Sequence, residues 1–568
     1  MTRPSALLVL AAAGLVVMTT AGPRAASSEP VRAAHGMVGS SEVHASQAGI
    51  EILKAGGNAV DAAVATGFAL AVTHPEAGNI GGGGFMVIRL ASGKETTIDY
   101  REKAPARATR DMFLDGQGNA VNDRSRSGPL SCGVPGSVAG LALAEREYGK
   151  LTLAKVMAPA IALARDGFLV SRSLADSFRR AQPRLSKFPA SLKAFYRDDG
   201  SPLREGDRLV QPDLARTLSL IASGGPRAFY RGAIADLVAR EMAASGGLIT
   251  KADLAAYRPA ERAAVTGTYH GYRVVSMPPP SSGGVGLLEL LNILEPYPVS
   301  EYGANSARTM HVMIEAERRV YADRAQWLGD PDFFKVPVTG LISKTYAGRL
   351  RASIDLSHAT PSADVRAGTP RDFEPTETTH YSVVDADGSA VSTTTTLNGG
   401  FGNAEVVAGA GFLLNNEMDD FSARPNSPNM FGLVGGEANA VAPGKRMLSS
   451  MTPTIVTRDG RTVLVLGSPG GSQIITTVLQ VLLDVVDFKM NVQEAVDAPR
   501  FHHQWTPDVV EIEKDRFAPD VLNALGALGH TTKVAKPMGE VYAIAVDPAS
   551  GERWGASDPR ADGATVGY

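Results

Sequence analysis

Thr378 is the residue whose position first suggests chemistry. It follows a segment rich in Pro, Thr, Ser, Gly and charged residues, 359–377, and it begins an expected strand that runs to Val384. If the chain were cut between Glu377 and Thr378, Thr378 would carry a free α-amine beside its own hydroxyl. Because an α-amine has a pKa near about 8, it can act as a base at neutral pH without a histidine. The pattern is typical of N-terminal nucleophile hydrolases, but a threonine that merely starts a strand also explains it.

The sequence after Thr378 predicts a hairpin that would hold this residue. The expected strand is followed by the turn Asp385-Ala-Asp-Gly388, and a threonine-rich return strand then ends at Thr396. His380 lies inside the first strand, directly after the candidate nucleophile. We interpret this histidine as structural and not as a base.

Helices and a glycine-rich turn are expected before this hairpin. The spacing of apolar residues predicts a helix over 41–55, with a serine available at its cap, and an Ala-rich helix over 59–72 that is buried on most sides. The glycine turn 78–84 leads into a strand and lacks the Gly-x-x-x-x-Gly-Lys-Ser/Thr pattern of a phosphate-binding loop. We therefore interpret its glycines as sites of close backbone packing. Residues 150–370 are expected to be mainly helical.

Composition places the chain among soluble globular proteins and excludes some partners. Its 568 residues would suggest three or four domains at about 150 residues each. Hydrophobic residues make up 44% and charged residues 20%, which is ordinary for a soluble protein. The net charge of −3 and the absence of a long Lys/Arg run argue against nucleic acid as a partner and against electrostatic membrane binding.

The N-terminus has the features of a secretory signal peptide. Arg3 precedes an apolar run over 6–18, and Thr19 and Ala21 are placed for cleavage after Ala21. The run is short for a membrane span, although an uncleaved anchor is the alternative. We expect residues 1–21 to be removed and the protein to be exported, periplasmic or secreted, without a stable membrane anchor.

Other reactive residue types give no second site. The single cysteine, Cys132, excludes an intramolecular disulfide and has no His or Asp neighbour, so we interpret it as a packed small residue. His502 and His503 have no partner at a metal-ligand spacing, and no His-Glu-x-x-His or Gly-x-Ser-x-Gly motif occurs. We therefore expect neither a metal nor a cofactor.

Four stretches carry a family resemblance: Thr378–Val384, Asn415–Phe421, Ser449–Pro453 and Ser468–Ile475. Their order and spacing are similar to those of the γ-glutamyltransferases (glutathione hydrolases), which the chain resembles from about residue 32 to its end. Together the four stretches make the resemblance highly specific. It implies an α/β fold, an αββα sandwich of the N-terminal nucleophile hydrolase type. It also implies one precursor cut between Glu377 and Thr378 into two subunits.

The resemblance therefore divides the chain by processing and not by three or four domains. Residues 1–21 would be the signal peptide, 22–377 the large subunit and 378–568 the small, catalytic subunit. Both subunits would contribute to one core and would stay associated.

The family's catalytic roles fall on four residues. Thr378 matches the nucleophile, and Thr396 matches a threonine whose hydroxyl supports the nucleophile's oxygen. Gly470 and Gly471 match the oxyanion hole. The local pattern agrees, since an apolar strand over 462–466 is followed by Pro-Gly-Gly and then by a helix expected from Gln473, and free N–H groups at a helix start face a developing oxyanion. A plain strand-to-helix turn would contain the same glycines.

Substrate binding in the family requires charges of both signs. A γ-glutamyl group carries an α-carboxylate and an α-ammonium at one end and its reacting amide at the other. Arg101 matches the arginine that binds the α-carboxylate, a task that suits its planar fork. The further residues implied are the carboxylate donors Ser449 and Ser450, the ammonium-binding Asp420, and the assisting Asn398 and Glu417. Each charged residue alone would be read as an ordinary ion-pair residue.

A lid is also implied by the family, over residues 425–436. This segment is rich in Pro, Gly and Asn and carries Met430, Phe431 and Leu433. Composition alone would suggest only a surface connection. Bacterial members often have Tyr where Phe431 stands.

The function implied is the hydrolysis and transfer of γ-glutamyl groups from glutathione and other γ-glutamyl compounds to water, amino acids or short peptides. The reaction would pass through a γ-glutamyl ester of Thr378. A cephalosporin or glutaryl acylase on the same fold is one alternative, which the acid at position 420 disfavours because an acylase needs no ammonium site. An inactive exported binding protein is the other, and Thr378, Gly470 and Gly471 disfavour it.

Overall fold

A computed structural model describes residues 29–370 and 380–568 of the chain. The expected signal peptide, 1–21, and the expected cleavage site, Glu377 and Thr378, lie outside the described residues.

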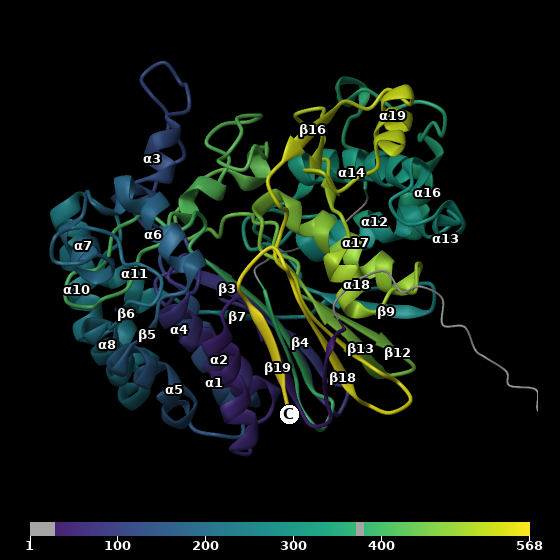
Figure 1. Cartoon of the computed structure of the whole chain (residues 1–568). Coiled ribbons are helices and arrows are strands. Elements are labelled where there is room, and N and C mark those ends of the chain that lie inside the picture. Colours follow the sequence, from purple (N-terminus) through teal and green to yellow (C-terminus); the bar gives the residue numbers. More distant parts are fainter. Residues whose placement is uncertain (1–28, 371–379) are drawn as a thin grey trace, which may run out of the picture.

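Two antiparallel sheets form the centre of the molecule (Figure 1). The first has the strand order β1-β18-β17-β13-β12-β9-β8, with β1 Val31–Ala33, β18 Arg553–Ser557, β17 Tyr542–Val546, β13 Arg461–Leu466, β12 Thr454–Arg458, β9 Tyr272–Ser276 and β8 Val265–Tyr269. The second has the order β19-β2-β10-β11-β3-β4-β7, with β19 Ala564–Gly567, β2 Met37–Ser40, β10 Tyr381–Val384, β11 Ala390–Thr396, β3 Gly83–Arg89, β4 Glu95–Asp99 and β7 Ala260–Arg262.

The two sheets pack face to face through apolar side chains. Phe85 and Val87 of β3 meet Val465 of β13 and Ile544 of β17 in one buried cluster. Alternating residues of a strand face opposite sides, so the other face of each sheet is left for helices. Each sheet contains strands from both sides of residues 371–379. The predicted αββα core, built from both parts of the chain, is therefore confirmed.

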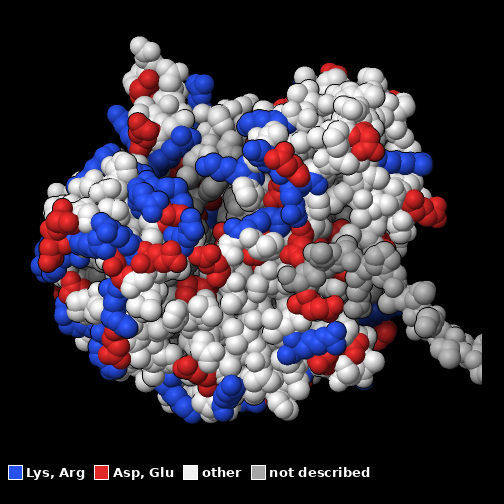
Figure 2. All heavy atoms as spheres, viewed as in Figure 1, with Lys and Arg blue, Asp and Glu red and all other residues white. Residues whose placement is uncertain are grey.

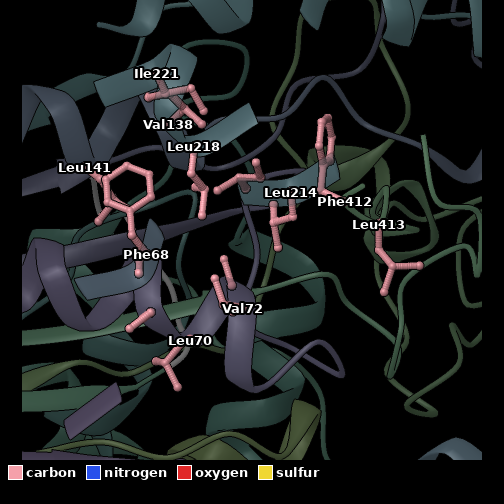
Figure 3. Close-up of a cluster of buried hydrophobic side chains, with 14 of the residues drawn as sticks. Phe68, Leu70, Val72, Val138, Leu141, Leu214, Leu218, Ile221, Phe412 and Leu413 are labelled. Atoms are coloured by element: carbon pink, nitrogen blue, oxygen red, sulfur yellow. The ribbon is translucent and has the colours of Figure 1, made fainter. Parts of the chain in front are cut away.

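One helical layer covers the second sheet. Its helix α2 (Ala59–Thr73) is buried along its whole length and packs against β10 and β11, while α1 (Val43–Lys54) packs on α2 and β2. In Figure 3, Phe68 and Val72 of α2 lie among Leu141 of α4 (Ser137–Tyr148) and the apolar face of α8 (Pro212–Gly224). Around them lie the other helices of the large N-terminal core, α5 Leu153–Asp166, α6 Arg172–Leu185, α7 Pro189–Phe195, α9 Pro226–Tyr230, α10 Ala233–Ser245 and α11 Lys251–Ala256.

A second helical layer covers the first sheet, on the other side of the sandwich in Figure 1. It is built around α12 (Gly283–Leu294), α14 (Ala307–Trp327) and α17 (Ile474–Val486), which share one hydrophobic cluster. The remaining elements of this part are α13 Val299–Tyr302, α15 Val338–Leu341, α16 Lys344–Ala352, α18 Val492–Asp497, α19 Pro519–Ala527 and the small sheet β14 Phe501–His502, β15 Val510–Glu513 and β16 Thr532–Ala535. The strand pair β5 Phe168–Leu169 and β6 Arg208–Leu209 contributes Phe168 and Leu209 to the N-terminal core, and α3 is Asn122–Arg126.

Local predictions largely agree with this fold. The helices expected over 41–55 and 59–72 are α1 and α2, but α1 is capped by Glu42, whose carboxylate accepts the Ala45 amide at 3.1 Å, and not by a serine. The glycine turn packs closely, because a β-carbon on Gly82 would lie 2.1 Å from the Thr396 carbonyl oxygen. Residues 150–370 are mainly helical, but they also contain β8 and β9.

Surface charge is mixed on the face that Figure 2 shows, where Lys and Arg alternate with Asp and Glu over much of the area. None of the helices formed by residues 29–370 and 380–568 is long and apolar enough to cross a membrane.

Candidate active site

Arg101 is the centre of a buried cluster of charged residues. It follows the end of β4, and the carboxylate of Asp99 holds its backbone amide at 3.0 Å. Its side chain is fully buried. One guanidinium nitrogen, Nη1, donates to Glu417, and the other, Nη2, donates to Asp420 Oδ2 at 2.6 Å. A buried charge requires this kind of pairing, so the cluster fixes the guanidinium fork in place.

The acids of this cluster outnumber its cation. Glu417 and Asp420 are the two ends of one short 3-10 helix, and Glu102 lies 4.0 Å from Arg101. Burial raises the pKa of all three carboxyls, and Arg101 opposes that shift. The raised pKa values indicate that one arginine does not fully compensate three buried acids, so a further cation placed here, such as the ammonium of an amino acid, would favour their ionised forms.

Ser449 and Ser450 lie beside this cluster. Arg101 Nε donates to the Met447 carbonyl oxygen at 3.3 Å, which ties the arginine to the segment that carries both serines. Arg324 of α14 donates to Ser450 Oγ at 3.1 Å. Both serines are buried, and Arg101 Nη2 lies 3.5 Å from the carbonyl oxygen of Leu448, the residue before Ser449.

Thr396 and Asn398 lie where β11 ends. The Asn398 amide donates to Thr396 Oγ1 at 2.8 Å, and its side-chain nitrogen donates to the Asn416 carbonyl oxygen at 3.0 Å. Asn398 has a φ of 73°, a conformation that asparagine tolerates better than most residues. Strand β10 begins at Tyr381, which pairs with Thr393 of β11, so the end of β10 closest in sequence to Thr378 lies at the Thr396 end of β11.

Gly470 and Gly471 connect β13 to α17. Their backbone φ angles are 131° and 58°, values that residues with a side chain rarely adopt. A 3-10 turn over Gly471–Gln473 precedes α17, which begins at Ile474 and so starts one residue later than expected. Within residues 29–370 and 380–568, neither glycine amide donates a hydrogen bond to the chain. Free amides before a helix can stabilise an oxyanion.

The lid, residues 425–436, connects these parts. Asn429 donates to Asp420 Oδ1 at 3.0 Å and accepts the Phe431 amide at 3.0 Å. The Phe431 ring lies against the oxyanion turn, because a β-carbon on Gly471 would lie only 2.4 Å from the ring. Next to this contact a cavity of about 370 Å³ is lined by Phe431, Gly470 and Gln504, among others. Residues 425–436 therefore extend from Asp420 to Gly470 and Gly471.

The structure brings most of the predicted site together. Arg101, Glu417 and Asp420 form one cluster, and the two serines adjoin it. Residues 425–436 join this cluster to Asn398, whose side-chain nitrogen donates to Met430 Sδ at 3.6 Å, and through Phe431 to Gly470 and Gly471. Thr378 and Glu377 lie outside the described residues, so their part of the site stays a prediction.

His380 and Cys132, which we interpreted as structural from the sequence, are both buried. His380 is buried between the hydroxyls of Ser382 and Ser392, and burial lowers its pKa to about 3. Cys132 is buried, and burial raises its pKa well above the usual value, so its thiol is not activated. No cluster of three or more His, Cys, Asp or Glu side chains suited to a metal ion occurs in the described part of the chain.

Three residues of the site were missed in the sequence. Glu102 follows Arg101 directly, and an acid next to a candidate arginine could have been suspected as its ion-pair partner. Arg324 is one of several charged residues on a helix, and no sequence signal indicates that it reaches Ser450. Asn429 lies in the lid, where asparagine is an ordinary turn residue.

Comparison with known proteins agrees with this geometry. The family model for gamma-glutamyltranspeptidase matches residues 45–568. The "Glutathione hydrolase proenzyme" of Escherichia coli (strain K12) is 54% identical over 540 residues, which cover 95% of this chain and 93% of that protein. The "Acylase ACY 1 proenzyme" of Pseudomonas sp. (strain SE83) is 40% identical and covers 95% of this chain and 94% of its own.

A solved structure with the same architecture is the cephalosporin acylase from Bacillus halodurans. It superimposes with a TM-score of 0.85 at 31% identity, over 97% of this chain and 98% of that chain. The same fold thus occurs in enzymes named for different acyl groups. The fold alone therefore does not determine which acyl group is bound, and the side chains of the site must do so.

Proposed function

Because the chain belongs to the gamma-glutamyltranspeptidase family, we propose that it hydrolyses and transfers γ-glutamyl groups from glutathione and related compounds. The observation that carries this proposal is the buried cluster of Arg101, Glu417 and Asp420, which adjoins two serine hydroxyls. An arginine fork fits the α-carboxylate of a γ-glutamyl group, and an acid fits its α-ammonium. The lid joins this cluster to the free amides of Gly470 and Gly471, where the reacting carbonyl would lie.

The proposed reaction has two steps. The Thr378 hydroxyl attacks the γ-carbonyl carbon, and the α-amine of Thr378 takes the hydroxyl proton. The Gly470 and Gly471 amides stabilise the oxyanion, and collapse of the intermediate expels the amine product with that proton. Water then attacks the γ-glutamyl ester and gives glutamate, or the amino group of an amino acid or short peptide takes the acyl group. Thr396 supports the nucleophile's oxygen from the adjoining strand end.

The proposed maturation supplies the catalytic base. Hydrolysis of the bond between Glu377 and Thr378 would leave a large subunit, 22–377, and a small subunit, 378–568, which stay together. We propose that residues 1–21 direct export to the periplasm or the medium and are removed. The α-amine exists only after cleavage, so the uncut chain should lack activity.

The test of maturation is sequencing of the small subunit. Its N-terminus should read Thr-Thr-His-Tyr, and the large subunit should begin at Gly22. Thr378→Ala should remain one chain and show no activity, because it removes the nucleophile. Any other start of the small subunit contradicts the proposal.

The test of substrate class compares two chromogenic donors. The mature enzyme should release p-nitroaniline from γ-glutamyl-p-nitroanilide, faster when glycylglycine is present as acceptor. Glutaryl-p-nitroanilide is the matched control, since it keeps the terminal carboxylate and lacks only the α-amino group. A preference for the glutaryl donor would favour the acylase alternative, which relatives named as acylases make the chief competitor.

A further inference from the structure

One ridge of α14 carries side chains able to form hydrogen bonds at every fourth position: His311, Glu315, Arg319, Asp323 and Trp327. Residues four apart lie on the same face of a helix. All five bond to the segment 353–368, which leads toward residues 371–379. The first contact is made by His311, whose Nε2 lies 2.8 Å from the Asp355 carbonyl oxygen.

The middle of the ridge holds two points of this segment. Glu315 accepts both the backbone amide of Thr360, at 3.0 Å, and its hydroxyl, at 2.6 Å. Arg319 donates to the Ser353 carbonyl oxygen at 2.6 Å and to its hydroxyl at 2.8 Å. Glu315 and Arg319 are buried and pair with each other at 2.8 Å, so both side chains are held in place where they bind the segment.

The end of the ridge fixes Gly368 at both of its backbone groups. Asp323 Oδ1 accepts the Gly368 amide at 2.6 Å, and Trp327 Nε1 donates to the Gly368 carbonyl oxygen at 3.1 Å. Tyr346 donates to the other oxygen of Asp323 at 2.5 Å. A β-carbon on Gly368 would lie 2.0 Å from the Tyr346 hydroxyl oxygen, so only glycine fits between these groups.

The carboxyl beside this anchor keeps Asp323 an acceptor. Glu289 of α12 is fully buried, and burial together with the charge of Asp323 raises the pKa of Glu289 well above its usual value. Burial raises the pKa of Asp323 as well, and its hydrogen bonds with Glu289, Tyr346 and the Gly368 amide oppose that shift. Buried polar groups without partners are costly, so this ridge is built to have the segment bound to it.

The same helix also reaches the candidate active site. Arg324 is the neighbour of Asp323 and bonds to Ser450. The hydroxyl of Tyr321 bonds to the Ser472 carbonyl oxygen, next to the oxyanion glycine Gly471. One rigid element therefore sets the distance between the anchored segment and the site.

We propose that this ridge of α14 positions the chain for its own cleavage, with Asp323 and Trp327 as positioning residues that hold Gly368. The inference rests on the proposed cleavage between Glu377 and Thr378. Cleavage consumes one water: the C–N bond breaks, Glu377 gains a carboxylate and Thr378 gains its free amine. Fixing Gly368 limits the conformations that the chain from Gly368 to the scissile bond must search.

The test follows maturation in three variants of the full-length chain. Gly368→Ala places a methyl group against Tyr346, Trp327→Phe keeps a ring but removes the bond to the Gly368 carbonyl, and Thr369→Ala changes the exposed neighbouring residue as the matched control. The fraction of uncut chain is measured over time on denaturing gels after a pulse of synthesis. Activity per mole of mature small subunit and the unfolding midpoint are measured beside it.

Gly368→Ala should mature roughly ten- to a hundredfold more slowly, because a displacement of about 1 Å at reacting groups has effects of that order. Trp327→Phe should mature about fivefold more slowly for one lost hydrogen bond. Thr369→Ala should mature at the parent rate. Mature enzyme from every variant should keep the parent kcat/KM.

Two results overturn the inference. Parent-like maturation in both Gly368→Ala and Trp327→Phe would show that the anchor is not used. Slow maturation accompanied by an equal loss of kcat/KM or by a lowered unfolding midpoint would show general damage to the fold in place of positioning. A parent chain that never forms two subunits would instead refute the proposed function itself.

Discussion

Arg101 has two acidic partners before any substrate arrives. The substrate's α-carboxylate would have to compete with these acids for the guanidinium of Arg101. Its α-ammonium would take the place of one guanidinium nitrogen as the partner of Asp420. This exchange keeps every buried charge paired, which is the condition for charges in a low-dielectric site. The same exchange makes recognition depend on both substrate charges at once.

Asp420→Ala tests the ammonium contact. Arg101 would keep Glu417 as a partner, so we expect the chain to fold and to mature. The kcat/KM for γ-glutamyl-p-nitroanilide should fall by roughly 2–5 kcal/mol in transition-state binding, because the substrate ammonium would be buried without its acid. Arg101→Ala should cause a loss of similar size through the α-carboxylate. Unchanged kinetics in Asp420→Ala would support the glutaryl acylase alternative.

The pH dependence of substrate capture should follow Asp420. Burial raises the pKa of its carboxyl to about 6, and only the ionised form, which is present above that pH, pairs with an ammonium. The kcat/KM for γ-glutamyl-p-nitroanilide should therefore fall as the pH drops below about 6. Its ratio to the kcat/KM for glutaryl-p-nitroanilide is the quantity to measure, since titration of the Thr378 amine affects both donors. A ratio that is constant from pH 5 to 8 would argue against this role.

At the scale of elements, local structure could be predicted better than strand order. The hairpin of β10 and β11 was predictable because its turn and its alternation lie within twenty residues. Strands β8 and β9 were missed in a region expected to be helical, because each has only five residues and their hairpin joins the sheet through β9, which pairs far along the chain. Val275 of β9, for example, pairs with Ile455 of β12.

The site shows the same limit. Arg101, Asp420 and the glycines could be proposed as site residues because they stand in motifs that match those of the family. The contact from Arg324 to Ser450 depends on how α14 is packed, and the partner of a single charged residue on a helix cannot be predicted from the sequence. Long-range packing therefore decides which polar residues meet, and the sequence pattern decides only which ones are available.

The effect of the lid on the reaction can be tested by a substitution that adds one hydroxyl group. Phe431 covers Gly471 but cannot donate a hydrogen bond from its ring, and one such bond contributes roughly 1 kcal/mol. We expect Phe431→Tyr to hold the lid closed for longer and to keep water from the acyl-enzyme. The ratio of transfer to hydrolysis at fixed glycylglycine should rise. If the ratio stays the same or falls, Phe431 serves only for packing.

At the scale of the whole molecule, the two parts of the chain share both sheets of the core. In the first sheet, β12, β13, β17 and β18 follow residue 380, while β1, β8 and β9 precede residue 371. In the second sheet, β10 and β11 lie between β2 and β3. Without the later part, β1 would be separated from β9 and β8 in the first sheet, and β2 from β3 in the second; without the earlier part, β19 would be separated from β10 and β11. Each part alone would expose apolar surface that the other now covers.

Cleavage should therefore leave one cooperative unit. We expect the mature enzyme to unfold in denaturant in a single transition, with the same midpoint for far-ultraviolet circular dichroism, which reports backbone structure, and for tryptophan fluorescence, which reports packing. Residues 22–377 expressed alone should not form a soluble folded protein, whereas co-expression with residues 378–568 should restore solubility. Two separate transitions, or a folded large subunit that survives alone, would mean that the shared sheets do not hold the subunits together.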